Sequence, residues 1–154
     1  MQMKIFDRMK LKKVSEEDVD FLYDMLKERD PIENILHKEM PKYEEHVKFV
    51  TESNPYDGWY IIMISSQKVG HINIIHKENY YVGWFIKKEF QNIGIPIKAF
   101  EILKKLHKSS IYTGKCNPKN IRSHILVEKL GFKLTKTFSD HLVFELDNSA
   151  KYGN

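Results

Sequence analysis

The chain is poor in cysteine, glycine and proline, and it has no long apolar run. Its single cysteine, Cys116, excludes an internal disulfide and a cysteine-based metal site, so we expect a small buried core residue and no oxidising compartment. No stretch reaches the roughly 18 uninterrupted apolar residues of a membrane span, and the N-terminus "MQMKIFDRMKLKK" lacks the apolar core of a secretory signal. These absences predict a cytoplasmic protein with no membrane partner.

Charge of one sign is not concentrated anywhere in the chain. The 25 Lys and Arg residues exceed the 21 Asp and Glu residues by a net charge of +4, and the lysines are scattered among glutamates. A nucleic-acid binder would show a one-sided basic stripe, so we expect no nucleic-acid partner. The small excess suits a polyanionic small ligand. With 154 residues, 42% of them hydrophobic, the chain fits one compact domain.

Hydrophobic periodicity predicts strands and helices in the order β-α-α-β-β-β-α-β-α-β-β. Ser15 is the expected N-cap of the first helix, and Asn117 that of the last, with Pro118 in its first turn and Gly131 as its terminator. The three central β-like runs are expected to form an antiparallel meander. The expected strands are 11–14, 59–64, 69–75, 80–86, 110–116, 132–137 and 141–146.

The join between the third central run and the following helix is "FIKKEFQNIGIPIKAFEILKKL", residues 85–106. It contains Gly94 and Pro96, and no acidic residue lies from Gln91 through Ala99. A strand that turns tightly into a helix directs several backbone N–H groups at one spot, backed by the positive end of the helix dipole. The join therefore predicts an anion site, although ordinary turns share the pattern. It is neither a Walker loop nor GxGxxG.

Two segments of the sequence resemble a known family. "GWFIKKEFQNIGIPIKAFEIL" is similar to the acyl-CoA motif Q/R-x-x-G-x-G/A of the GNAT superfamily of N-acetyltransferases, and "NPKNIRSHILVEKLGF" resembles its N-x-x-N-x-x-S/A segment with an E-K-L-G-F ending. The resemblance covers about residues 10–146, which implies a single domain over 1–154. It implies an α/β (α+β) fold: a mixed, mostly antiparallel sheet of about seven strands, flanked by about four helices, in which the strand near 80–86 splays from a parallel strand near 110–116.

The resemblance also implies acetyl-CoA or CoA as the acyl donor. Because "HKEM" and "EEHV" lack HExxH spacing, we expect no metal. Phe85 and Ile86 would pair with the pantetheine arm through their backbones, Asn120 would reach toward it, Ser123 lies one turn further on, and Lys129 would meet a CoA phosphate. Pro96 replaces the usual Gly or Ala and removes one amide donor. The amides expected to hold the pyrophosphate belong to Gln91, Asn92, Ile93, Gly94, Ile95 and Ile97.

Acyl transfer to an amine needs a neutral nucleophile, stabilisation of the oxyanion and a proton for the thiolate. Many members of the family carry a tyrosine as that acid where this chain has Val127. The candidate catalytic residues are His71, Glu78 and Tyr80, each of which also has an ordinary explanation as a buried, solvated or packing residue. Strand alternation puts His71 and His76 on opposite faces, which argues against a shared metal.

Acceptor specificity in this superfamily resides mostly in segments that correspond to about residues 30–58 and 136–142. More loosely, the chain resembles the bacterial branch that includes ribosomal-protein and sugar-amine acetyltransferases. That likeness favours a small amine such as a nucleotide-linked amino sugar, with a protein N-terminus as the alternative partner. A CoA-binding module without catalysis is the rival from another class. Dimers are common among relatives, so a homodimer is a further candidate.

Overall fold

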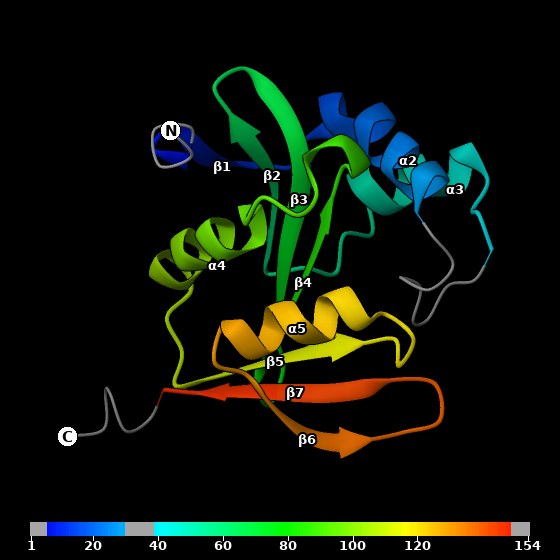
Figure 1. Cartoon of the computed structure of the whole chain (residues 1–154). Coiled ribbons are helices and arrows are strands. Elements are labelled where there is room, and N and C mark those ends of the chain that lie inside the picture. Colours follow the sequence, from blue (N-terminus) through cyan, green and yellow to red (C-terminus); the bar gives the residue numbers. More distant parts are fainter. Residues whose placement is uncertain (1–5, 30–38, 149–154) are drawn as a thin grey trace.

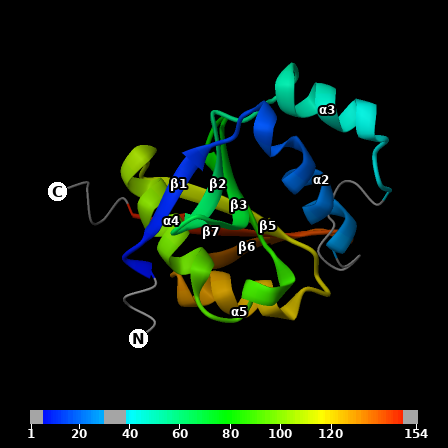
Figure 2. The same cartoon turned by 90° about the horizontal axis from the view of Figure 1, so that it is seen from above.

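The computed structural model describes residues 6–29 and 39–148, which form one sheet with helices on both faces (Figures 1 and 2). The predicted order of elements and the antiparallel meander are confirmed. The strands are β1 (Met9–Lys13), β2 (Gly58–Ile64), β3 (Gln67–His76), β4 (Tyr80–Ile86), β5 (Ile111–Cys116), β6 (Lys133–Thr137) and β7 (Leu142–Asp147). The helices are α2 (Val19–Glu28), α3 (Tyr43–Thr51), α4 (Ile95–Leu106) and α5 (Ile121–Lys129), with 3-10 turns at Glu16–Asp18 and Lys88–Phe90.

The sheet has seven strands in the order β1-β2-β3-β4-β5-β7-β6. Its parallel pair is β4 with β5, and its other neighbours pair antiparallel. The parallel contact comprises only Tyr80 with Tyr112 and Tyr81 with Thr113, after which the two strands diverge. The predicted mixed sheet with splayed central strands is therefore confirmed, and a split opens between β4 and β5 beyond Tyr81.

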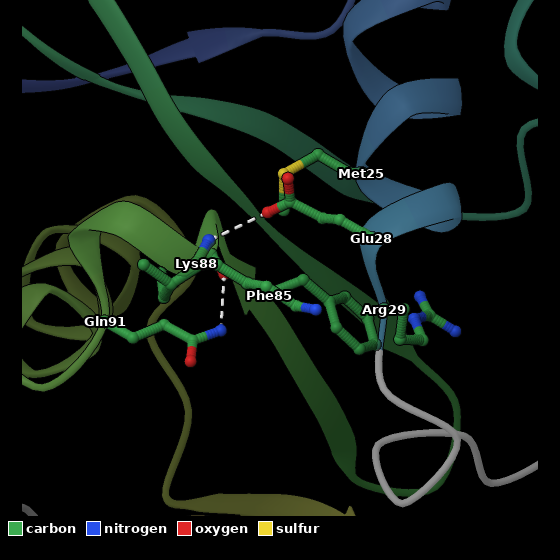
Figure 3. Close-up of a pocket in the computed structure, with 7 residues that line it drawn as sticks. Met25, Glu28, Arg29, Phe85, Lys88 and Gln91 are labelled. Atoms are coloured by element: carbon green, nitrogen blue, oxygen red, sulfur yellow. Dashed lines mark hydrogen bonds between the residues drawn. The ribbon is translucent and has the colours of Figure 1, made fainter.

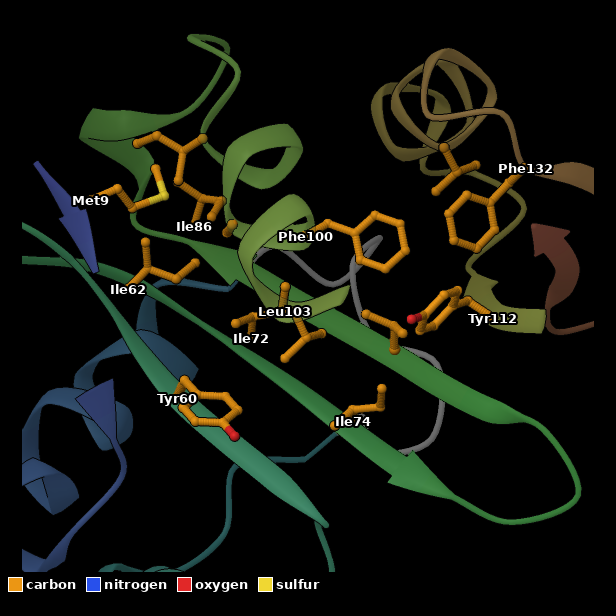
Figure 4. Close-up of a cluster of buried hydrophobic side chains, with 14 of the residues drawn as sticks. Met9, Tyr60, Ile62, Ile72, Ile74, Ile86, Phe100, Leu103, Tyr112 and Phe132 are labelled. Carbon is orange, nitrogen blue, oxygen red and sulfur yellow. The ribbon is translucent and has the colours of Figure 1, made fainter. Parts of the chain in front are cut away.

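The larger core lies between the sheet and the helices α4 and α5, on what we call the α4/α5 face (Figure 4). Ile72 and Ile74 of β3 pack there with Phe100 and Leu103 of α4, and all four side chains are fully buried. A smaller cluster lies on the opposite face of the sheet, which α2 and α3 cover and which we call the α2/α3 face. It comprises Val19, Leu22, Val50, Trp59 and Ile61. Cys116 is buried in the larger core, as the sequence predicts.

Two details of the sequence prediction are wrong. We expected Asn117 to cap the last helix, yet its side-chain oxygen accepts the Lys119 N–H at 2.9 Å in a separate turn. Asn120 is the N-cap, and its side-chain oxygen accepts the Ser123 N–H at 3.2 Å. A side chain of this type can close either a turn or a helix start, and only the backbone path decides between them. The spacing of apolar residues along 95–106 also predicts a buried Leu106, yet its side chain is 55% exposed because the helix ends there.

Candidate functional site

The turn from β4 to α4 combines left-handed backbone with free amides. Asn92 has φ 68° and Gly94 has φ 85°, and among the described residues the N–H groups of Asn92, Ile93, Gly94 and Ile95 have no hydrogen-bond acceptor. A row of amides in such a turn, at the start of a helix without acidic residues in its first turn, makes a concave anion site. We call these four amides the amide nest.

The nest has fewer free amides than the six that the sequence predicts. The Gln91 N–H already donates to the Lys88 carbonyl at 3.3 Å, and the Ile97 N–H donates to the Gly94 carbonyl at 3.2 Å. Pro96 has no N–H to offer and lies in the first turn, as expected. Gly94 is required by its dihedral angle and not by crowding, because a Cβ built there would meet only the Phe6 ring, at 3.8 Å.

The side chain of Gln91 connects the nest to two neighbouring elements. Its Nε2 donates to the Ile86 carbonyl at 2.9 Å, and its Oε1 accepts a hydrogen bond from the Arg122 guanidinium on α5. Arg122 was missed in the sequence, although it stands two residues after the Asn120 N-cap. Lys129, which we expected to meet a phosphate, lies seven residues further, about 10 Å along the helix at 1.5 Å per residue. The structure therefore places Arg122 beside Gln91, the residue before the nest, and the contact of Lys129 with a CoA phosphate stays a prediction.

A shallow hollow lies between the end of β4 and the end of α2, and Phe85, Ile86 and Gln91 line it (Figure 3). The Glu28 carboxylate of α2 accepts the Lys88 N–H at 2.8 Å, which ties this helix to the segment that leads into the nest. The guanidinium carbon of Arg29 lies 3.8 Å from the centre of the Phe85 ring. The predicted pantetheine contacts, Phe85 and Ile86, and the residue that precedes the nest, Gln91, thus line one hollow.

Asn120 and Ser123 are half-buried at the start of α5. Because the Asn120 oxygen caps the helix, its Nδ2 is the group that remains to donate to a ligand. Val127 is 3% exposed and belongs to the larger core, so its position supplies packing and no proton donor.

The three predicted catalytic residues are not brought together. His71 lies buried on the α2/α3 face, where it contacts the ring of Phe85 at 5.3 Å. Tyr80 contacts Tyr112 at 6.2 Å on the α4/α5 face, near the other end of β4. Glu78 is exposed in the turn between β3 and β4.

The environment of His71 keeps its ring neutral. Burial, followed by the positive charge of Arg29 and of His46, lowers the pKa of His71 from 6.5 to about 3. Its Nδ1 accepts a hydrogen bond from the indole N–H of Trp59 at 3.2 Å. A neutral ring that accepts at Nδ1 carries its proton on Nε2, so in this state His71 offers a donor there. To accept a proton at Nε2, the ring would have to change tautomer and give up the Trp59 bond.

Parts of both predicted acceptor segments can be described, whereas residues 30–38 lie outside the described range. Tyr56 and Trp59 pack with ring centres 4.9 Å apart on the α2/α3 face, the face that carries His71. In the turn from β6 to β7, the 48% exposed Phe138 stacks on His141, with ring centres 4.6 Å apart. His141 Nδ1 is 2.7 Å from an Asp140 carboxylate oxygen.

Two kinds of feature are absent from residues 6–29 and 39–148. No group of three or more His, Cys, Asp or Glu side chains is arranged to hold a metal ion. In the same ranges, no helix is both long enough and apolar enough to cross a membrane.

Comparison with known proteins identifies the family. Residues 8–133 match the acetyltransferase (GNAT) domain, and no curated protein matches the chain. A domain from Methanocaldococcus jannaschii superposes with a TM-score of 0.76 at 22% identity, covering 90% of this chain and 97% of that one. RimL, a ribosomal L7/L12 alpha-N-protein acetyltransferase in complex with coenzyme A, gives 0.74 at 15% identity, covering 93% and 96%. Spermidine N-acetyltransferase from Vibrio cholerae, a dodecamer, gives 0.72 at 15% identity, covering 96% and 98%.

These superpositions show that the seven-stranded sheet, split between β4 and β5, is a fold that the chain shares with solved acetyltransferase structures. The chain belongs to the GNAT acetyltransferase family.

Proposed function

We propose that the chain transfers an acetyl group from acetyl-CoA to a primary amine by direct attack within a ternary complex. The observation that carries this proposal is the amide nest beside the split between β4 and β5. A pyrophosphate needs several donors at one point, and the nest offers four N–H groups at the positive end of a helix. The split offers unpaired strand edge to the amides of a pantetheine arm.

The roles of individual residues follow from their positions. The amides of Asn92 to Ile95 bind the pyrophosphate, and Arg122 adds a charged donor once its bond to Gln91 opens. The backbones of Phe85 and Ile86 pair with the pantetheine arm, and the Asn120 Nδ2 donates to it from α5.

Attack needs an acceptor nitrogen that has lost its extra proton, because an ammonium has no lone pair. A backbone N–H of β4 would stabilise the oxyanion that develops on the thioester carbonyl oxygen when the amine attacks the carbon. Of the three catalytic candidates, His71 alone lies beside Phe85 on the α2/α3 face. We therefore retain His71 as the candidate that contacts the acceptor, and its Nε2–H is the group that would donate a hydrogen bond.

For the acceptor we favour a small amine such as a nucleotide-linked amino sugar. The half-buried ring of Tyr56 on the α2/α3 face offers the kind of surface on which a sugar or base can stack. The alternative is a protein N-terminus, which the likeness to RimL supports. A CoA-binding module without catalysis remains the alternative from another class, because Val127 supplies no acid.

Two measurements test the proposal. Calorimetric titration with acetyl-CoA and CoA should give saturable binding, and a thiol-release assay should then show acetyl-CoA consumption with an amino sugar, spermidine or a peptide with a free N-terminal amine. Binding without thiol release would favour the module. A folded protein that binds neither nucleotide would contradict the assignment of the nest. Light scattering would test the homodimer that we propose for the chain in solution.

A further inference from the structure

The helix α2 ends at Arg29, and the side chain of this residue borders the hollow beside β4. The backbone N–H of Arg29 donates to the Leu26 carbonyl at 3.4 Å, which closes the last turn of the helix. The side chain is half-buried and lines the hollow together with Phe85 and Ile86, the residues predicted to pair with pantetheine (Figure 3). The guanidinium therefore stands next to the predicted path of the acyl donor.

A row of ring side chains connects Arg29 with the rest of the α2/α3 face. Phe85 lies between Arg29, 3.8 Å from its ring centre, and His71, whose ring centre is 5.3 Å away. His71 accepts the Trp59 N–H, and Trp59 packs on Tyr56. Burial lowers the pKa of His71 and raises that of Tyr56, and the charge of Arg29 adds to the first change and opposes the second. The guanidinium thus lies close enough to both side chains for its charge to act on them.

The hydrogen-bonding groups around the hollow are mostly donors. A guanidinium has five N–H donors and no acceptor, and neutral His71 presents its Nε2–H because its Nδ1 accepts the Trp59 N–H. The Glu28 carboxylate, which also lines the hollow, already accepts the Lys88 N–H at 2.8 Å. Among the described residues, the charged side chains that line the hollow are one anion, Glu28, and two cations, Arg29 and Lys88. A donor-rich site with a net positive charge favours a ligand group that is anionic and rich in acceptors.

We propose that Arg29 is a specificity-determining residue that binds an anionic group, a phosphate or a carboxylate, on the acceptor amine. This inference rests on the proposed function and narrows it: the acceptor carries a negative charge besides its amine, which disfavours a polycation such as spermidine. The planar guanidinium matches two oxygens of either anion. Arg29 makes other contacts as well, and five donors can serve these contacts and a ligand together.

The test uses three amino sugars that share one amine and differ in charge. Glucosamine carries no anion, glucosamine 6-phosphate carries a phosphate, and muramic acid carries a carboxylate. Each sugar is titrated by calorimetry into protein saturated with CoA, so that binding is measured whether or not acetyl transfer follows. The variants are Arg29→Gln, which removes the charge, and Arg29→Lys, which keeps the charge and loses the planar fork.

Lys27→Gln is the matched control. Lys27 lies two residues earlier on α2, its side chain is 60% exposed, and its Nζ is 3.8 Å from an Asp24 carboxylate oxygen. The control removes the same charge from the same helix at a position outside the residues that line the hollow. Melting temperatures from circular dichroism show whether each variant is folded.

We expect at least one anionic sugar to bind the native CoA complex about tenfold more tightly than glucosamine does, with a smaller difference at high salt. The sugar that gains affinity identifies the anion as phosphate or carboxylate. Arg29→Gln should bind all three sugars within about twofold of one another and CoA within about twofold of the native protein. Arg29→Lys should keep part of the preference, and Lys27→Gln should keep all of it.

Three results would overturn the inference: a native protein that binds neither anionic sugar more tightly than glucosamine, a folded Arg29→Gln variant that keeps the preference, or an Arg29→Gln variant that loses affinity for CoA and not for the anionic sugar. If Arg29→Gln does not fold, an Arg29→Lys variant with the full preference would have the same consequence. A folded native protein that binds no CoA would instead overturn the proposed function itself.

Discussion

Gly94 offers a direct measurement of what the amide nest contributes. In Gly94→Ala the added methyl meets no atom closer than the Phe6 ring at 3.8 Å, so crowding is not the problem. The φ of 85° is the problem, because a side chain at left-handed φ costs about 1–2 kcal/mol. We expect the free energy of unfolding to fall by about that amount unless the turn relaxes. A relaxed turn no longer aligns its amides, and one lost bond to a charged ligand, about 1.5–3 kcal/mol, weakens CoA binding by roughly 10- to 150-fold.

Gly131 supplies the matched control for this experiment. It ends α5 with φ 98°, and a Cβ there would meet a flexible Leu146 methyl at 3.2 Å. Gly131→Ala should therefore lose stability to a similar extent in denaturant titrations, while calorimetry gives a native Kd for CoA. A Gly94→Ala variant that keeps both the native stability and the native Kd would have relaxed its turn without losing CoA, and that result would refute the reasoning from free amides to pyrophosphate.

Three further predictions concern charge and burial. Arg122→Ala should weaken CoA binding about tenfold, with a smaller effect at high salt, whereas Lys129→Ala at the far end of α5 should leave the Kd unchanged in the same titration. Burial lowers the pKa of His71 from 6.5 to about 3 in the folded protein. Between pH 6.5 and pH 3 the unfolded chain therefore binds a proton at His71 that the folded chain does not bind, so the free energy of unfolding falls as the pH drops. At pH 5 the loss is roughly 2 kcal/mol, and urea titrations of His71→Gln at pH 7 and pH 5 should show a shallower decline than the native protein. Burial raises the pKa of the Cys116 thiol to about 11, so a thiol reagent at pH 8 should label it only after unfolding, and rapid labelling of the folded protein would contradict that burial.

The order of elements could be predicted from the sequence because each element carries its own period. The meander of β2, β3 and β4 follows from alternating runs between polar turns, and α4 follows from a broad apolar stripe. The junction at Gly94 was also predictable, since a glycine that needs left-handed φ and a proline in the first turn are local signals.

The site could be predicted only where its residues are consecutive in the chain. Arg122 reaches the nest because α5 lies beside the β4–α4 turn, which no local pattern reveals. His71 and Tyr80 were grouped by chemistry, yet strand parity and register place them on opposite faces and at different ends of β4. Register is fixed by pairing across the sheet, so a single-chain pattern does not give it.

The two-rung contact between β4 and β5 also bears on how the folded protein opens. It leaves β1–β4 and β5–β7–β6 as two blocks, joined by Tyr80 and Tyr81 of β4 and by the packing of Phe100 on Tyr112 and Phe132. Blocks with few shared hydrogen bonds separate at a lower free energy than global unfolding requires. Amides of β4 that face the split should therefore exchange with solvent early. A molecule lodged in the split would bridge the blocks, so its arrival should slow hydrogen exchange on both sides and make the sheet behave as one cooperative unit.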